Sequence, residues 1–463
     1  FKNYQGRVSQ TKINSIAVLP LKSYKNTIDD TLAIRITDAV ITRLGTSDKI
    51  IVRPTNAVLP FSNEEQDATE IGRKLQTDTV LDGRIQQEEN RLRITLQLIN
   101  VSDGRHLWSG QIDGFATQIL SLQDEVSLKI LQNLDPDYQK ETILTSTPTK
   151  NSDAYEAYLQ GRYFASQRTG EGLNKAVEFF QKSIQLDPNF AESYAGLADT
   201  QYLLYDYNFI VTKTQVETAR TNLQKSLSLK PNLADTLITM GAMQMNYDWD
   251  WKNAEESYKK AIEISSNNSS ARSRYGALLT RLGRFEEAQT QYGKAVELDP
   301  LSLSGNVNLG MVYFCKKDFE AANRQFYKGL EINPKYSSAH WLLSRSLWLQ
   351  GKKDEAVKEI LTALELDGNQ QLAEKLKFSA QKSPEAVLRD LLFEWRDDPQ
   401  TTNPHNMAYL SAILGEKEKA LEWLEKSFAE HHPWTTWIKA APEFEMLKDK
   451  PRFQEIIRKM SLQ

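Results

Sequence analysis

The chain has 463 residues, and its 57 lysines and arginines stand against 61 acidic residues, which gives a formal net charge of −4. This balance provides no electrostatic reason for the chain itself to contact nucleic acid. A single cysteine, Cys315, excludes an intrachain disulfide and a cysteine-rich zinc site, and the length predicts two or more domains.

The first 135 residues alternate between strand-like and helix-like patterns. The expected strands are 15–20, 49–53, 79–83, 91–98 and 106–110, and the expected helices are 28–44, 68–75 and 119–134. Residues 91–98 alternate strictly between apolar and polar, as a strand with one buried face does. The order β-α-β-α-β-β-β-α predicts an α/β domain with a mixed sheet and helices over residues 1–135, followed by a linker over residues 136–152.

After the linker, a sequence pattern recurs about every 34 residues. Pro188, Pro231, Pro300 and Pro334 each close a helical stretch, and one further step of 34 residues lands on Gly368. Small residues recur at fixed offsets inside each unit and an aromatic or large aliphatic residue recurs between them, which lets two antiparallel helices approach closely. The prolines stop the second helix because they cannot extend its hydrogen-bond ladder. A period of this length predicts a helical solenoid.

The repeated positions resemble the tetratricopeptide repeat family. The resemblance implies an all-α tetratricopeptide-repeat superhelix of about six repeats over residues 153–368, with an insertion near residues 205–214. The frame is poor after Gly368, so residues 369–463 are expected to hold degenerate repeats and C-terminal capping helices.

Segments of the first domain resemble a second family, the TolB-N-like (FlgO-like) domain. The segments that carry the resemblance are 16–20, 51–55, 80–83, 98–104 and 107–108. In that family the domain precedes tetratricopeptide repeats in membrane-anchored bacterial regulators with a winged-helix DNA-binding domain of the CadC or ToxR type, and some relatives carry a kinase or an adenylate cyclase there instead. Residues 155–163, 194–199 and 442–453 are similar to the same architecture, so the resemblance covers nearly the whole chain.

Residue patterns for catalysis or metal binding are missing from the sequence. It contains no glycine-rich phosphate loop, no Gly-x-Ser-x-Gly elbow and no His-Glu-x-x-His. His431 and His432 are adjacent, but no third metal ligand is evident near them. Cys315 stands beside Lys316 and Lys317, which can lower a thiol pKa in principle, yet we expect it to serve packing. We therefore predict no catalytic residue, no metal and no cofactor.

The first helix of each repeat is expected to line an inner groove. Its candidate binding residues are Val307, Met311, Phe314, Trp341, Arg345 and Trp348. Tryptophan and arginine dominate binding hot spots, so this is where a partner peptide or helix is expected. The alternative is that these side chains pack against neighbouring helices or against the C-terminal helices.

Together these features predict a non-enzymatic sensory and protein-interaction region of a membrane-anchored transcriptional regulator. The resemblance implies a location outside the cytoplasm, in the periplasmic part of an inner-membrane protein. It also implies a protein or peptide partner in the repeat groove, and it allows a homodimer. No run of about 18 apolar residues occurs, so the membrane segment is expected outside these residues, because the chain begins at Phe1 rather than methionine. The alternative function is a free-standing envelope scaffold that binds partner peptides, and an enzyme is a distant third.

Overall fold

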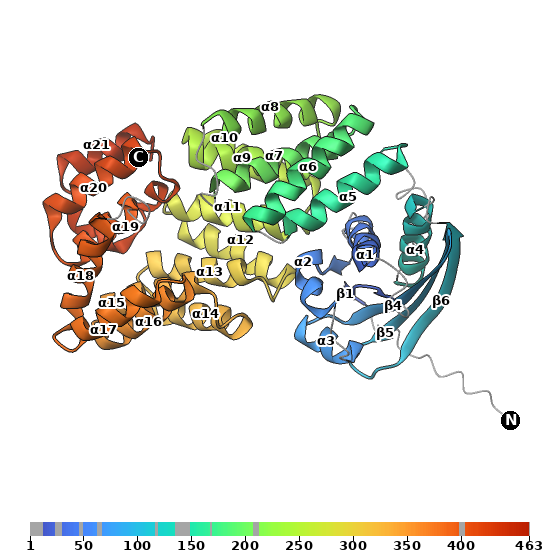
Figure 1. The fold of residues 1–463 in the computed structure, drawn as a ribbon, viewed down its shortest axis with the longest axis horizontal. Coiled ribbons are helices and arrows are strands. Elements are labelled where there is room, and N and C mark those ends of the chain that lie inside the picture. The colour runs from blue at the N-terminus through green and yellow to red at the C-terminus, as the bar shows by residue number, and fades with distance from the viewer. Residues whose placement is uncertain are drawn as a thin grey trace. The chain divides into compact units, whose positions relative to one another are not determined.

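The computed structural model describes residues 13–23, 30–45, 50–62, 67–115, 119–134, 149–166, 169–206, 213–397 and 403–462. Figure 1 labels their helices and strands. The chain divides into two compact units. The first comprises residues 1–236 with 265–267, and the second comprises residues 237–264 with 268–463. Most of the expected linker over residues 136–152 lies outside the described residues.

The first unit begins with a mixed sheet. Its strands are β1 (Ser15–Val18), β2 (Lys22–Ser23), β3 (Ile51–Val52), β4 (Thr79–Glu88), β5 (Arg91–Asn100) and β6 (His106–Phe115). The order is β3-β1-β4-β5-β6, and β2 also pairs with β4. Strands β1 to β4 pair in parallel, whereas β4, β5 and β6 pair antiparallel through tight connections. The predicted mixed sheet with helices is therefore confirmed.

The helices of this domain are α1 (Asp30–Leu44), α2 (Thr55–Val58), α3 (Ala68–Lys74) and α4 (Ile119–Leu134), with a short 3-10 helix η1 at Leu59–Phe61. The strict alternation of β5 buries its apolar side chains on one face, where Leu92, Ile94, Leu96 and Leu98 are fully covered. Helix α4 packs closely on β6, because Gly114 has no side chain where a Cβ would lie 2.5 Å from Leu122. Strand β2 and helix α2 were not predicted, because two and four residues are too few to show a period.

Helical hairpins follow the sheet. In the first unit they are α5 (Ser152–Ser166), α6 (Gly170–Leu186), α7 (Ala191–Asp206) and α8 (Lys213–Leu229). Part of the predicted insertion, residues 207–212, lies outside the described residues. The small frame positions Ser183 and Ser226 donate hydrogen bonds to the carbonyls of Ala154 and Ala191, at 2.7 and 2.9 Å. A hydroxyl at this position thus ties each second helix to the start of its own hairpin.

Within the first unit, helix α1 of the sheet domain is joined to helix α5. The Arg162 guanidinium lies 3.1 Å from Asp38 and donates a second hydrogen bond, of 3.2 Å, to Thr42. Beside this polar contact, Ala39 of α1 belongs to the same buried apolar cluster as Tyr155 and Tyr158 of α5. The first hairpin is therefore packed directly on the α/β domain.

The repeats continue with α9 (Ala234–Met243), which begins at the end of the first unit, and a one-turn π-helix η4 (Gln244–Asp248). Further helices of the second unit are α10 (Trp251–Ile264), α11 (Ser269–Arg281), α12 (Phe285–Leu298), α13 (Leu303–Cys315), α14 (Phe319–Ile332), α15 (Ser337–Leu349) and α16 (Lys353–Leu366). Close approach within a hairpin depends on glycine, because a Cβ at Gly276 or Gly310 would lie within 2.7 Å of the ring of Tyr292 or Phe326. The predicted tetratricopeptide frame is confirmed here.

After Gly368 the helices become shorter and less regular. They are α17 (Gln370–Ala380), α18 (Pro384–Asp397), α19 (Pro404–Ile413), α20 (Lys417–Ala429) and α21 (Pro451–Lys459), with 3-10 helices η5 (Pro433–Trp437) and η6 (Pro442–Leu447) between the last two. Prolines stand at the start of η5, η6 and α21, where the missing backbone donor costs nothing. They divide residues 433–462, here named the C-terminal segment, into short pieces.

Candidate functional site on the first helices of the repeats

The predicted groove residues are mostly buried inside the second unit. Val307, Met311, Phe314 and Trp348 are each less than 8% exposed and belong to its main apolar cluster. Val307 faces helix α14, because its Cγ2 lies 2.6 Å from where a Cβ at Gly329 would be. Their packing against neighbouring elements agrees with the alternative interpretation of these side chains.

Arg345 binds the chain's own C-terminal segment. Its Nε donates a hydrogen bond of 2.5 Å to Glu443 of η6, and the two side chains are 10% and 0% exposed. The guanidinium also lies over the rings of Phe314 and Tyr409, at 5.3 and 5.1 Å from their centroids. Burial alone would lower the pKa of Arg345, but the charge of Glu443 and its hydrogen bond raise that pKa above the usual value.

Two more residues of the repeats hold the same segment. Arg281 at the end of α11 donates a 2.8 Å hydrogen bond to the hydroxyl of Thr436 and places its guanidinium 4.0 Å from the ring centroid of Trp437. Trp251 at the start of α10 donates from its indole nitrogen to the carbonyl of Met460 at 2.6 Å. Together with Arg345, these contacts anchor the C-terminal segment at three points on helices of the repeats.

Trp341 is the predicted groove residue that keeps a partly exposed side chain. Its indole nitrogen donates a 3.0 Å hydrogen bond to Asp367, and its ring lies 5.6 Å from that of Trp395 on α18. Trp348 is instead buried, with the Lys353 ammonium 5.4 Å from its ring centroid. The six predicted residues therefore separate into a buried set that contacts the C-terminal segment or the core and one indole that solvent still reaches.

Three of the five histidines lie near the C-terminal segment: His405 on α19, and His431 and His432 directly before η5. His405 is 2% exposed, its ring stacks at 6.3 Å on that of His432, and neither of its ring nitrogens has a hydrogen-bond partner among the residues that the structure describes. Burial lowers the pKa of His405 well below its usual range and the pKa of His432 to about 4. Both rings are therefore neutral at pH 7. His431 stacks on Trp249 at 4.4 Å and points to a different partner.

The remaining candidate groups are the Cys315 thiol and possible metal ligands. Burial raises the pKa of the Cys315 thiol to about 12, so the neighbouring lysines do not activate it, contrary to what their position in the sequence allowed. No cluster of three or more histidine, cysteine, aspartate or glutamate side chains suited to a metal occurs among the described residues.

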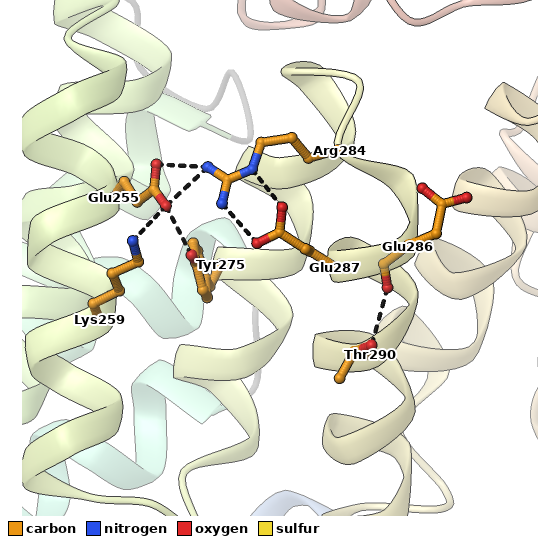
Figure 2. A network of polar contacts seen from close by, with 7 residues as sticks. All are labelled: Glu255, Lys259, Tyr275, Arg284, Glu286, Glu287 and Thr290. Carbon is orange, nitrogen blue, oxygen red and sulfur yellow. Dashed lines mark hydrogen bonds and ion pairs between the residues drawn. The ribbon is translucent and has the colours of Figure 1, made fainter.

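A polar network joins two successive hairpins beside the buried set (Figure 2). Glu255 of α10 accepts hydrogen bonds from Tyr275 of α11 at 2.9 Å and from Arg284 at 2.8 Å, and Lys259 lies 2.7 Å away. Arg284 also forms a two-point pair with Glu287. Burial would raise the pKa of Glu255, but these donors together lower it to about 2. The network links α10 to α11 and to the start of α12, and it pairs both Glu255 and Glu287 with Arg284.

Sequence reasoning missed the partners of Arg345 and Arg281. Glu443 lies 98 residues after Arg345, and Thr436 lies 155 residues after Arg281. Nothing in the 34-residue period indicates that the chain returns to the first helices. The poor repeat frame after Gly368 and the prolines at 433, 442 and 451 do indicate that the end of the chain differs from a repeat.

Comparisons with known proteins find similarity in both parts of the chain. Residues 11–138 match the HilA/YgeH-like transcriptional regulator, second domain, and residues 276–337 and 337–370 match the tetratricopeptide repeat. Putative adenylate cyclase 3 of Rhizobium meliloti (strain 1021) is 27% identical over 187 residues, which are 40% of this chain and 32% of that protein. The chain thus spans about a third of this curated relative.

Two solved structures share the helical repeat. MamA is 24% identical, and the match covers 34% of this chain and 92% of MamA with a TM-score of 0.30. YrrB, described as a tetratricopeptide protein with an unusual peptide-binding site, is 21% identical, and the match covers 43% of this chain and 98% of YrrB with a TM-score of 0.31. Across the described parts of the chain, no helix is both long and apolar enough to cross a membrane. The chain joins a domain similar to the second domain of HilA/YgeH-like transcriptional regulators to tetratricopeptide repeats of the kind that mediate protein interactions.

Proposed function

We propose that this chain is the sensory and protein-interaction region of a membrane-anchored bacterial transcriptional regulator. The observation that carries the proposal is the order of its parts, in which a domain similar to the second domain of transcriptional regulators precedes tetratricopeptide repeats. The first domain is of the TolB-N-like kind in this proposal, and the chain is the extracytoplasmic part of an inner-membrane protein. Its role is binding rather than catalysis, because the polar clusters described above are engaged in packing and ion pairs.

The junction between helices α1 and α5 supports signal transfer in this proposal. The Asp38–Arg162 pair and the packing of Ala39 on Tyr155 fix the first hairpin to the α/β domain. When a partner binds, each repeat can rotate slightly against the next, and these small rotations add up along the array. Such a change reaches the α/β domain through this junction and alters the orientation or dimerisation of the regulator.

A protein or peptide partner is proposed to contact the first helices at Trp341. Of the proposed binding residues Val307, Met311, Phe314, Trp341, Arg345 and Trp348, this is the one whose ring is not covered by the core or the C-terminal segment. The others serve the proposed site by fixing α13 and α15. Tryptophan at the rim of a packed surface is a typical hot-spot residue.

Transcript profiling in the native bacterium tests this function. Deletion of the gene is expected to change a defined set of transcripts, and the wild-type gene on the chromosome restores them. The Trp341→Ala variant is expected to lose most of the response, because it removes the partly exposed indole, and its cellular level is measured beside the wild type because the ring also packs on Trp395. The matched control is Phe378→Ala, which removes an aromatic ring that is 68% exposed on α17 and is expected to restore the response fully.

The result that contradicts the proposal is an unchanged transcript profile after deletion. If the same deletion strain loses an envelope complex instead, the free-standing scaffold is the better account. If Trp341→Ala and Phe378→Ala restore the transcripts equally well, the regulator function stands but the binding residue lies elsewhere.

A further inference from the structure

A cavity of about 480 Å³ lies within the second unit, between the repeats and the C-terminal segment. Three parts of the chain line it: the turn after α11 with Gly283 and Phe285, the end of α13, and the stretch from η5 to η6. Its volume falls within the range of small-molecule sites, roughly 300–1,000 Å³. The lining residues are Gly283, Phe285, Cys315, Lys316, Lys317, Lys439, Ala440, Glu445 and Lys448.

The lining carries an excess of positive charge. Lys317 and Lys448 share the single lining acid, Glu445, at 3.2 and 2.8 Å, so two ammonium groups stand against one carboxylate. Lys316 lies 3.3 Å from Glu286, which is 82% exposed and outside the lining. Lys439 has no acidic partner among the residues that the structure describes. Even with Glu286 included, four lysines stand against two acids.

Lys439 is the least satisfied of these groups. It is half-buried, and burial lowers its pKa because the charged ammonium loses contact with water. A doubly charged anion in the cavity would place one negative charge near Lys439. Its second charge would balance the excess positive charge of Lys317 and Lys448, which share Glu445. Phe285, Ala440 and the buried Cys315 offer apolar surface beside these charges.

We propose that this cavity binds a small phosphate monoester. A phosphate group carries close to two negative charges at pH 7 and three acceptor oxygens, which suits an excess of two ammonium groups, and lysine binds phosphate as a point charge. A small organic group attached to that phosphate fits against Phe285. Because Lys316 and Lys317 come from the repeats while Lys439 and Lys448 come from the C-terminal segment, the bound anion holds these two parts together. The biological role of this binding rests on the proposed sensory function, whereas the binding itself does not depend on it.

Titration calorimetry of the purified chain tests the site directly, with inorganic phosphate and glycerol phosphate as probes and chloride keeping the ionic strength constant. We expect saturable binding of one equivalent, weakened about tenfold or more in Lys439→Gln, since a lost hydrogen bond between charged groups costs at least this factor. The matched control is Lys419→Gln on α20, an exposed lysine that pairs with Glu416 at 3.1 Å and is expected to leave binding unchanged.

Site-resolved acylation of lysines gives a second readout on the wild-type protein. Glycerol phosphate is expected to protect Lys439 and Lys448 from an amine-reactive reagent and to leave Lys419 reactive. The proposal is overturned if phosphate binds wild type and Lys439→Gln equally, if chloride produces the same heat, or if a phosphoserine peptide binds while glycerol phosphate does not. A positive binding result with an unchanged transcript profile after gene deletion would retain the cavity site and reject the regulator function.

Discussion

Replacing Arg345 by alanine is expected to lower the free energy of unfolding by about 3–5 kcal/mol, because the change leaves the carboxylate of Glu443 buried without its counter-charge. Glu443 is fully covered, Arg345 is its ion-pair partner, and its second carboxylate oxygen has no hydrogen-bond partner in the described structure. Urea unfolding followed by circular dichroism measures the change.

Two further variants separate the ion pair from simple packing. The double variant Arg345→Met/Glu443→Leu removes both charges and is expected to recover most of the lost stability, since well-packed apolar residues often replace a buried pair without loss. The control Arg458→Ala removes a guanidinium that is 60% exposed and pairs with Glu455, and it is expected to cost less than about 1 kcal/mol. An Arg345→Ala variant as stable as this control would show that η6 is not held on α15.

Acidification below pH 6.5 is expected to destabilise the protein through His405. The folded state keeps this imidazole neutral because its burial lowers its pKa, whereas the unfolded chain titrates near the ordinary value of about 6.5. Below that pH the unfolded state binds one more proton at His405, so this residue alone lowers the stability by about 1.4 kcal/mol per pH unit, or about 2 kcal/mol by pH 5. His432, whose pKa is lowered to about 4, adds a loss in the same range of pH. The loss is absent above pH 6.5, where both states are neutral.

Urea unfolding at several pH values tests this dependence. The variant His405→Leu is expected to reduce the slope between pH 6.5 and 5 to the part that His432 contributes, because the pKa of His432 is also lowered, to about 4, while His106→Leu, at an exposed position on β6, is expected to keep the full slope. A second loss begins below pH 4.5, because the pKa of Glu255 is lowered to about 2 and its ion pairs disappear as the acid protonates. Equal slopes in wild type and His405→Leu between pH 6.5 and 5 would contradict the assignment to His405.

Much of the fold follows from short-range patterns. The alternation of Leu92, Ile94 and Leu96 gives one buried face of the sheet, and the 34-residue spacing gives the hairpins, because each depends on contacts between neighbours in the sequence. The glycine positions of the repeat frame, such as Gly276 and Gly310, are explained by the rings that lie against them. Elements of two to four residues, such as β2, carry no period and escaped prediction.

The candidate site was predicted less completely, for a physical reason. A groove position such as Arg345 has the same sequence signal whether it faces solvent, a partner or a distant part of its own chain. Its partner Glu443 lies 98 residues away, and Arg281 reaches Thr436 across 155 residues. Contacts of this separation do not follow from the repeat period. The lysines of the cavity were missed for the same reason, because Lys317 and Lys439 are far apart in the sequence and line the same cavity only in the folded chain.

Amide hydrogen exchange of the C-terminal segment tests most directly the central claim that the first helices of the repeats hold residues 433–447. The backbone amides of Ala440 and Ala441 donate hydrogen bonds to the carbonyl of Trp437 within this stretch, and both side chains are buried. We expect protection similar to that of α13 in the wild-type chain and a marked loss of protection in Arg345→Ala, with the α/β domain unaffected. Exchange of this stretch as fast as that of an exposed loop, and equal in the two proteins, would contradict the account.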